Sequence, residues 1–176
     1  MLEGKHVRLR AVEKKDLKQL LAWRNKPEFR KHFREHRVLS MTEQQKWYDN
    51  FVIKDDKTIM FAIEEKRAKK LIGCCGLCHI NWIQHNADLS IYIGKNNHYI
   101  DLKYAPDAAH TLIDYAFNVL NFHRMWTEIY SFDHRKKKFL KKLGFSLDGK
   151  HRETYWHLNK WHDSYFYGLL RREFNK

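Results

Sequence analysis

Three cysteines and a histidine gather in one short segment, C-C-G-L-C-H, from Cys74 to His79. Read literally, C-G-L-C-H is the attachment signature of a c-type haem, which usually belongs to an exported protein. Zinc would require further ligands at matching spacing, and the chain has no second cysteine pair. The apolar flanks Leu71, Ile72 and Ile80 are equally typical of a buried strand, in which a reduced cysteine acts as a small hydrophobe. We therefore expect structural cysteines and no metal.

A dense run of cations, Arg135 to Lys138 followed by Lys141 and Lys142, is the second feature with chemical potential. The whole chain carries a formal net charge of +13. Such a charge suits an anionic partner, which is a nucleic acid, an acidic protein surface or a phosphorylated small molecule. The alternative is that the lysines and arginines only solvate the surface. The twelve histidines are scattered and show no metal-ligand spacing.

The composition predicts a folded protein. Hydrophobic residues make up 43% of the 176 residues and aromatic residues 15%, which is enough to bury a core. No apolar run approaches the ~18 residues of a membrane span, and the first ten residues do not resemble a signal peptide. We expect a cytoplasmic protein without a membrane partner. With two prolines, seven glycines and no repeat or linker, residues 1–176 are expected to form one domain.

Hydrophobic periodicity and turn signals predict an alternation of strands and helices that must position these residues. The expected strands are 7–11, 58–64, 71–80, 88–93, 125–132, one from Phe145 onward, and 165–170. The expected helices are 13–24, one capped by Ser40 or Thr42, one from Pro106 to about Leu120, and 135–143 before Gly144. This order predicts the α/β (α+β) class, a mixed sheet with helices on its faces.

That order and several local phrases resemble the GNAT acetyltransferases, in particular the branch of ribosomal-protein N-terminal and nucleotide-amino-sugar acetyltransferases. The phrases are L-A-W-R-N (21–25), L-I-G-C-C-G-L (71–77), A-D-L-S-I-Y-I-G (87–94), Y-A-P-D-A (104–108), D-Y-A-F-N-V-L (114–120), K-K-L-G-F (141–145) and H-D-S-Y-F-Y-G-L-L-R-R-E-F (from 162). Each phrase is weak alone, but the ordered set covers nearly the whole chain. The resemblance implies a GNAT-like, mostly antiparallel sheet with flanking helices.

The resemblance also implies a reaction, namely transfer of an acetyl group from acetyl-CoA to a primary amine. The acceptor would be a nucleotide-linked amino sugar, another small amine with or without a phosphate, or a protein N-terminus. In the family, one strand splays from its neighbour and its backbone pairs with the pantetheine arm; here Ile91, Tyr92 and Ile93 would take that role. A backbone N–H there would polarise the thioester carbonyl. Lys103, Tyr104 and Ala105 would open the helix whose N-terminus faces the pyrophosphate.

Three positions depart from the family pattern. Lys103 stands where a glycine normally lets phosphate approach the backbone. Asp133 stands where an asparagine often contacts the cofactor. Leu140 stands where many members carry the tyrosine that protonates the departing thiolate. Leucine cannot donate a proton, so that role is absent, filled elsewhere or left to water.

The resemblance places further candidate side chains. Asp88 matches the glutamate that the histone-acetyltransferase branch uses as general base, and it is the predicted catalytic residue; the alternative is a carboxylate held by local hydrogen bonds. Lys137 and Lys138 would clasp the phosphates of CoA. Trp23, Arg24 and Asn25 would lie near the acceptor, with Arg24 pairing with a phosphate or carboxylate. A core Trp23 beside a surface Arg24 is the alternative.

Two other functions compete with the enzyme. A GNAT-like module that binds CoA without catalysis is consistent with Lys103 and Leu140. A basic nucleic-acid binder is suggested by charge and aromatic content, but the chain has no recognisable nucleic-acid motif, so we do not expect that partner. An oligomer is compatible with the sequence.

Overall fold

The computed structural model describes residues 1–174, in which eight strands form one continuous sheet. The strands are β1 (Leu2–Glu3), β2 (Val7–Ala11), β3 (Ile59–Glu65), β4 (Lys70–Asn81), β5 (Asn86–Ile93), β6 (Arg124–Tyr130), β7 (Ser146–His157) and β8 (Lys160–Leu170). Their order in space is β1-β2-β3-β4-β5-β6-β8-β7. Among the described strands only β5 and β6 pair in parallel. The predicted mixed, mostly antiparallel sheet is confirmed.

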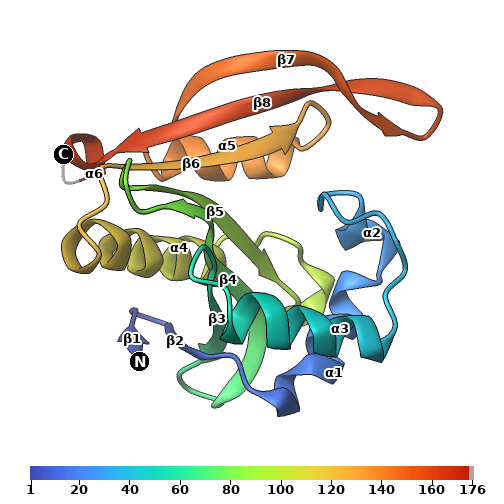
Figure 1. The fold of residues 1–176 in the computed structure, drawn as a ribbon, viewed down its shortest axis with the longest axis vertical. Coiled ribbons are helices and arrows are strands. Elements are labelled where there is room, and N and C mark those ends of the chain that lie inside the picture. The colour runs from blue at the N-terminus through green and yellow to red at the C-terminus, as the bar shows by residue number, and fades with distance from the viewer. Residues whose placement is uncertain (175–176) are drawn as a thin grey trace.

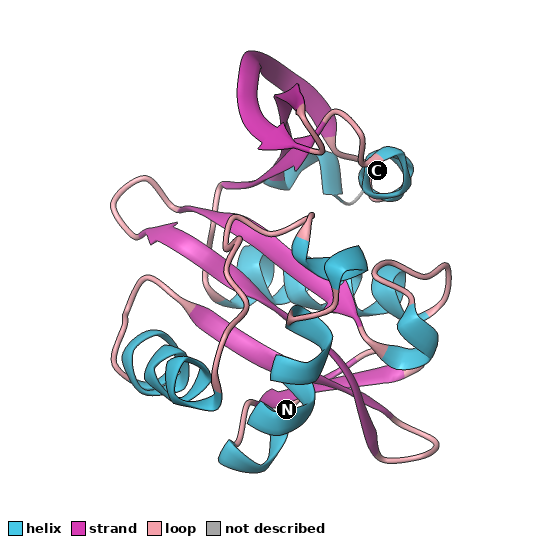
Figure 2. Cartoon of the chain, turned by 90° about the vertical axis from the view of Figure 1, so that its right-hand side faces the viewer, coloured by secondary structure: helices cyan, strands magenta, loops and turns pink. Residues whose placement is uncertain are grey.

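Six α-helices accompany the sheet in the described part of the chain, and π-helical segments at Tyr48–Ile53 and Tyr115–Val119 extend two of them. The α-helices are α1 (Leu17–Arg24), α2 (Pro27–Arg30), α3 (Met41–Trp47), α4 (Tyr104–Asp114), α5 (His134–Lys142) and α6 (Arg171–Phe174). Helix α4 packs on β2, β4 and β5. Figure 1 shows α5 beside the strands β6 and β8, and α1 and α3 beside the N-terminal strands. Figure 2 shows the β7–β8 hairpin at one end of the molecule, with helices on either side of the other strands.

Local sequence explains these elements. The apolar run of β4 is buried over most of its length, as expected for a central strand covered on both faces. Strand β2, V-R-L-R-A, alternates between fully buried Val7 and Leu9 and partly exposed arginines. A capping box starts α3, since Ser40 Oγ accepts from the Glu43 N–H at 3.2 Å and Glu43 Oε2 accepts from the Ser40 N–H at 2.7 Å.

The predicted bounds differ from the structure mainly at the ends of elements. The expected helix 13–24 has its α-helical part at Leu17–Arg24, after a 3₁₀ turn at Lys14–Asp16. Pro27 lies in the first turn of the short helix α2, where its missing N–H is tolerated. The expected last strand 165–170 is the second half of the longer β8, which pairs with β7 along almost its whole length.

Candidate active site

The sheet opens between β5 and β6. The two strands are paired only from Asn86↔Arg124 to Asp88↔Trp126, and they diverge beyond that point (Figure 1). The last link is a side chain, since the Thr127 hydroxyl donates to the Leu89 carbonyl at 3.1 Å. The rest of β5 therefore presents a strand edge that β6 does not cover.

The three predicted backbone positions, Ile91, Tyr92 and Ile93, do not all face this opening. The Gly94 N–H donates to the Ile72 carbonyl in β4, so by the alternation of strand hydrogen bonds Tyr92 also faces β4, whereas Ile91 and Ile93 face the opening. The Ile93 N–H donates to the Tyr99 carbonyl at 2.9 Å. The backbone groups of Ile91 are thus the ones left for a ligand.

A cavity of about 540 Å³ lies at this opening. Its walls come from the segment around α1–α3, from β3 to β5, and from β6 and the start of α5. The lining residues are Arg24, His32, Phe33, Arg34, Glu35, Gln44, Trp47, Phe51, Asp55, Lys57, Thr58, Met60, Cys74, Cys78, His79, Asp88, Leu89, Ser90, Ile91, Tyr92, Tyr99, Glu128, Tyr130 and Lys136. Asp88, Arg24 and the freed edge of β5 therefore share one space.

Asp88 is a buried carboxylate with two basic neighbours in this cavity. Its Oδ2 lies 2.8 Å from Arg34 Nη1 and 3.4 Å from His79 Nδ1. Burial by itself raises the pKa of Asp88, but the His79 contact and the Arg34 charge outweigh burial and hold the pKa below its usual value. Arg34 also pairs with Glu128 at 3.0 Å. Asp88 is therefore ionised at neutral pH and held in place.

His79 owes its position beside Asp88 to an irregularity in β4. The register with β5 shifts between Cys78 and Asn81, and His79 has a left-handed φ of 50°. Its side chain is 60% exposed. His79 thus contacts the buried Asp88 carboxylate on one side and solvent on the other.

The three predicted acceptor-side residues have different surroundings. Trp23 is buried in the core and packs against Gly94, where even a Cβ would meet the indole ring. Asn25 is structural, because its side chain exchanges two hydrogen bonds of 2.8 Å with the backbone of Leu39. Arg24 lines the cavity, with its guanidinium carbon 5.3 Å from the centre of the Phe33 ring.

Two side chains that line the cavity, Arg24 and Gln44, have no hydrogen-bond or ion-pair partner among the described residues. Within residues 1–174 the Arg24 guanidinium makes no hydrogen bond or ion pair with another side chain. Gln44 is fully buried in α3 and lines the cavity, yet neither atom of its side-chain amide has a hydrogen-bond partner among the described residues. An unpaired buried amide is unfavourable by about 1–3 kcal/mol, which a polar ligand would offset.

Helix α5 separates the predicted basic run into two faces. Asp133 is its N-cap, accepts from the Lys136 N–H at 2.9 Å, and lies 2.9 Å from His32 Nδ1. Burial alone raises the pKa of Asp133, but His32 and the helix start outweigh it and the pKa is lowered. Lys137 lies over the Tyr165 ring at 5.4 Å and Lys138 is exposed, so neither lines the cavity. Lys136 does, and it is 93% buried, with 7% of its surface exposed.

The start of α4 is not the open anion site that the sequence predicts. The first-turn N–H groups of Tyr104 and Ala105 both donate to Asp101 Oδ1, at 2.9 and 2.7 Å. The Tyr104 hydroxyl donates to Glu65, and exposed Lys103 lies over the Tyr104 ring at 4.9 Å. The carboxylate of Asp101 thus occupies the place expected for a phosphate.

The cysteines of the sequence motif lie along β4. Cys74 and Cys75 are buried and Cys78 is partly buried. Burial raises the pKa of the Cys74 and Cys78 thiols to about 12. No group of three or more His, Cys, Asp or Glu side chains within residues 1–174 is arranged to hold a metal ion. None of the helices in that range is long and apolar enough to cross a membrane.

Sequence comparison assigns the class of protein. The family profile described as an acetyltransferase (GNAT) domain matches residues 6–146. The chain belongs to this family, and it is an N-acetyltransferase. GNAT acetyltransferases use acetyl-CoA as the acetyl donor.

Individual relatives refine the comparison. The chain is 26% identical over 171 residues to the uncharacterized N-acetyltransferase p20 of Bacillus licheniformis, covering 94% of this chain and 93% of that protein. It is 26% identical to the spermidine N(1)-acetyltransferase of Vibrio cholerae, covering 80% and 79%. The solved structure of a spermidine N-acetyltransferase from Vibrio cholerae in complex with CoA and spermine has a TM-score of 0.88 at 23% identity, covering 98% and 100%. The narrower resemblance to ribosomal-protein and amino-sugar enzymes is not supported by these relatives.

The residues present fit acetyl-CoA at its thioester end. The Ile91 backbone and the cavity offer a strand edge for the pantetheine amides and room for the acetyl group. Positive charge near the start of α4 comes from exposed Lys103 and from exposed Arg135, whose Nη1 donates to the Ile100 carbonyl at 3.5 Å. The N–H groups of Tyr104 and Ala105, in the first turn of α4, donate to Asp101.

Sequence reasoning did not select most residues of the cavity, among them Arg34, Gln44, His79 and Lys136. Lys136 had a signal: it precedes the apolar Phe139 and Leu140 by three and four positions, which places it on their helical face. Gln44 had no such signal, because a glutamine on the exposed face of a helix would give the same sequence pattern.

Proposed function

We propose that this chain transfers an acetyl group from acetyl-CoA to a small primary amine that also carries an anionic group. The observation that supports it is one cavity that joins the uncovered edge of β5, the ionised Asp88 and the unpaired Arg24. Residues 147–170 lie beyond the family match, but β8 pairs with β6 from Arg124↔Leu170 to Tyr130↔Ser164. We therefore propose that residues 1–176 act as one domain.

The residues divide the reaction between them. Acetyl-CoA supplies an acetyl thioester. The Ile91 N–H would donate to the carbonyl oxygen, where negative charge develops as the amine attacks. Asp88 would receive the proton of the amine, directly or through water, and exposed His79 would carry it to solvent. Because its pKa is lowered, Asp88 is a weak base. Its contribution to the rate would come mainly from holding the carboxylate close to the amine.

The charges in the cavity favour an anionic group on the acceptor. Three of its four carboxylates are ion-paired, Asp88 and Glu128 with Arg34, and Glu35 with Arg37 at 2.7 Å. The fourth, Asp55, accepts only from the Lys57 N–H and the Thr58 hydroxyl. A second ammonium of a polyamine would therefore have to bind at Asp55 or displace an arginine. Arg24, by contrast, has a free guanidinium that suits a carboxylate or phosphate, and the Gln44 amide can add a hydrogen bond.

A polyamine is the second candidate acceptor, and the named activity of two relatives favours it. A protein N-terminus is a further candidate acceptor. An amine panel separates them: spermidine, spermine, aminoalkyl phosphates, amino acids, a nucleotide-linked amino sugar and a short peptide, each with acetyl-CoA. We expect the highest kcat/KM for an anionic amine. A preference for spermidine over every anionic amine would overturn the acceptor proposal, and no turnover with any amine would overturn the enzyme proposal.

A further inference from the structure

Lys136 is a largely buried residue whose ammonium has no partner within residues 1–174. Only 7% of its surface is exposed, and its ammonium makes no hydrogen bond or ion pair among residues 1–174. Lysine is almost never buried in this way unless it is paired. Its backbone is held in place because the Lys136 N–H donates to the N-cap Asp133. The fold therefore keeps an unpaired ammonium in the cavity.

The position of Lys136 matters because of Leu140. Leu140 is completely buried and does not line the cavity, so this position offers no proton donor. Lys136 precedes it by four residues in α5, on the same face of the helix. It lines the cavity together with Ile91, whose freed backbone marks the thioester end.

We propose that the Lys136 ammonium donates the proton that the departing CoA thiolate needs; this inference rests on the proposed function. As the amine nitrogen bonds to the carbonyl carbon and the C–S bond breaks, the sulfur takes the electron pair of that bond and a proton from Lys136 Nζ. The proton that the amine loses leaves through Asp88 and His79. Solvent returns one proton to Lys136, so the cycle balances.

Other donors in the cavity are less suited. Tyr99 and Tyr130 also line it, but burial raises the pKa of both hydroxyls above the usual tyrosine value. Burial instead lowers the pKa of Lys136, although nearby carboxylates oppose that shift. A donor is most effective when its pKa is close to the working pH and to that of the group that it protonates. The charged and titratable groups that face Lys136 are Asp133 of α5, Asp88 of β5, Arg34 after α2 and Cys78 of β4.

The first test is Lys136→Met, which keeps the length and removes the ammonium. With the best amine of the panel, kcat should fall about 10²-fold, at the low end for lost acid–base catalysis because a thiolate is a tolerable leaving group. The falling alkaline limb of the kcat–pH profile should disappear. Lys136→Arg keeps the charge but cannot release a proton, so its kcat should stay well below wild type. Lys18→Met, an exposed lysine in α1, is the matched control.

The second test needs no turnover. Ultraviolet absorbance follows ionisation of the thiol of bound CoA as pH rises. In the wild type the ammonium should lower the pKa of that thiol, and Lys136→Met should raise it by about 1–3 pH units. Wild-type kcat in either Lys136 variant, or an unchanged thiol titration, would overturn the role of Lys136 alone. If the wild type neither binds CoA by calorimetry nor acetylates an amine, the proposed function itself fails and the inference with it.

Discussion

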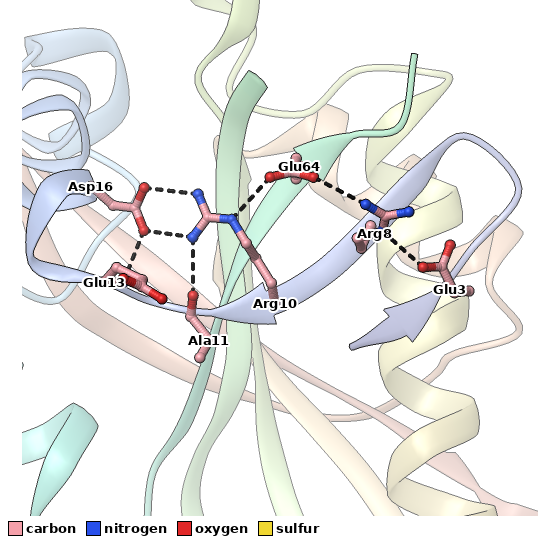
Figure 3. Close-up of polar contacts among 7 residues, drawn as sticks. All are labelled: Glu3, Arg8, Arg10, Ala11, Glu13, Asp16 and Glu64. Atoms are coloured by element: carbon pink, nitrogen blue, oxygen red, sulfur yellow. Dashed lines mark hydrogen bonds and ion pairs between the residues drawn. The ribbon is translucent and has the colours of Figure 1, made fainter. Parts of the chain in front are cut away.

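Two regions of the molecule hold partly or largely buried cationic side chains, and the two regions differ in how these side chains are paired. At the N-terminal end of the sheet, Arg10 is fully paired (Figure 3). Its Nη1 and Nη2 reach the two oxygens of Asp16 at 2.7 and 2.8 Å, and its Nε reaches Glu64 at 3.1 Å. Arg8 continues the cluster, 2.7 Å from Glu3 and 3.5 Å from Glu64. This bidentate cluster ties β2 to β3 and to the start of α1.

In the cavity between β5 and β6, Arg24 and Lys136 have no such partner among the described residues, and the Gln44 amide is unpaired as well. Of these groups, the Gln44 amide atoms are themselves buried. Because an unpaired buried amide is unfavourable in the free protein, we infer that something other than the chain completes it. The Arg10 cluster is complete and holds the architecture. The cavity is incomplete, and we infer that its ligands supply the missing partners.

The largest effect should come from Asp88, whose carboxylate is held by Arg34 and His79 in the cavity. Asp88→Asn should keep the fold and acetyl-CoA binding while kcat falls about 10²–10⁴-fold, as for a lost general base. Because the pKa of Asp88 lies below its usual value, the loss should be similar from about pH 6 to pH 9. Steady-state kinetics across that range test this. Wild-type turnover would remove Asp88 from the mechanism.

Arg24→Met should have a smaller and more selective effect. Loss of a charge-assisted contact of about 1.5–3 kcal/mol should raise KM for the anionic acceptor roughly 10–150-fold, with kcat nearly unchanged. KM for acetyl-CoA should stay the same, and the melting temperature should change little, because the Arg24 guanidinium has no ion pair among the described residues and only lies over the Phe33 ring. An equal rise in KM for an uncharged amine would show that Arg24 acts through packing instead.

Asp101→Ala should have the smallest effect, with two opposite parts. Loss of the bonds to the Tyr104 and Ala105 amides should destabilise the protein by about 1 kcal/mol, as for loss of a helix cap. The same amides then become free for the pyrophosphate, so acetyl-CoA should bind more tightly. Denaturant unfolding and calorimetry measure the two parts. Weaker acetyl-CoA binding would mean that Asp101 shapes the donor site rather than competing for it.

The paired region was easier to predict than the cavity. The apolar run of β4 and the alternation of β2 depend on nearest neighbours, so their periods were readable from the sequence. Strand β6 pairs with β5 only at its start but with β8 over its whole length. The separation of β5 from β6 therefore involves a partner strand that lies about 40 residues later in the chain, which a local pattern does not reveal. Asp88 was predicted only because of family resemblance, and its Arg34 partner comes from an irregular segment with no periodicity.

The helix α5 shows the same limit for single residues. The run from Arg135 to Lys138 reads as uniform charge, but the helix phase fixed by the Asp133 cap turns Lys136 inward and leaves Lys138 exposed. Likewise no sequence signal assigned a role to Asp101, whose carboxylate accepts from the first-turn N–H groups of the helix that the family motif offers to phosphate.

The contrast between the two regions is tested most directly by the ligand-free stabilities of Arg10→Met and Lys136→Met, measured by denaturant unfolding. Arg10→Met breaks a complete cluster and should destabilise the protein by about 3 kcal/mol, the low end for breaking a buried pair. The lowered pKa of Lys136 means that its charged form is unfavourable in the folded state. Lys136→Met should therefore stabilise the protein at neutral pH, and the gain should shrink as pH rises through the folded and then the unfolded pKa of the lysine. A loss of stability in both variants would contradict the account, because Lys136 would then be as well paired as Arg10.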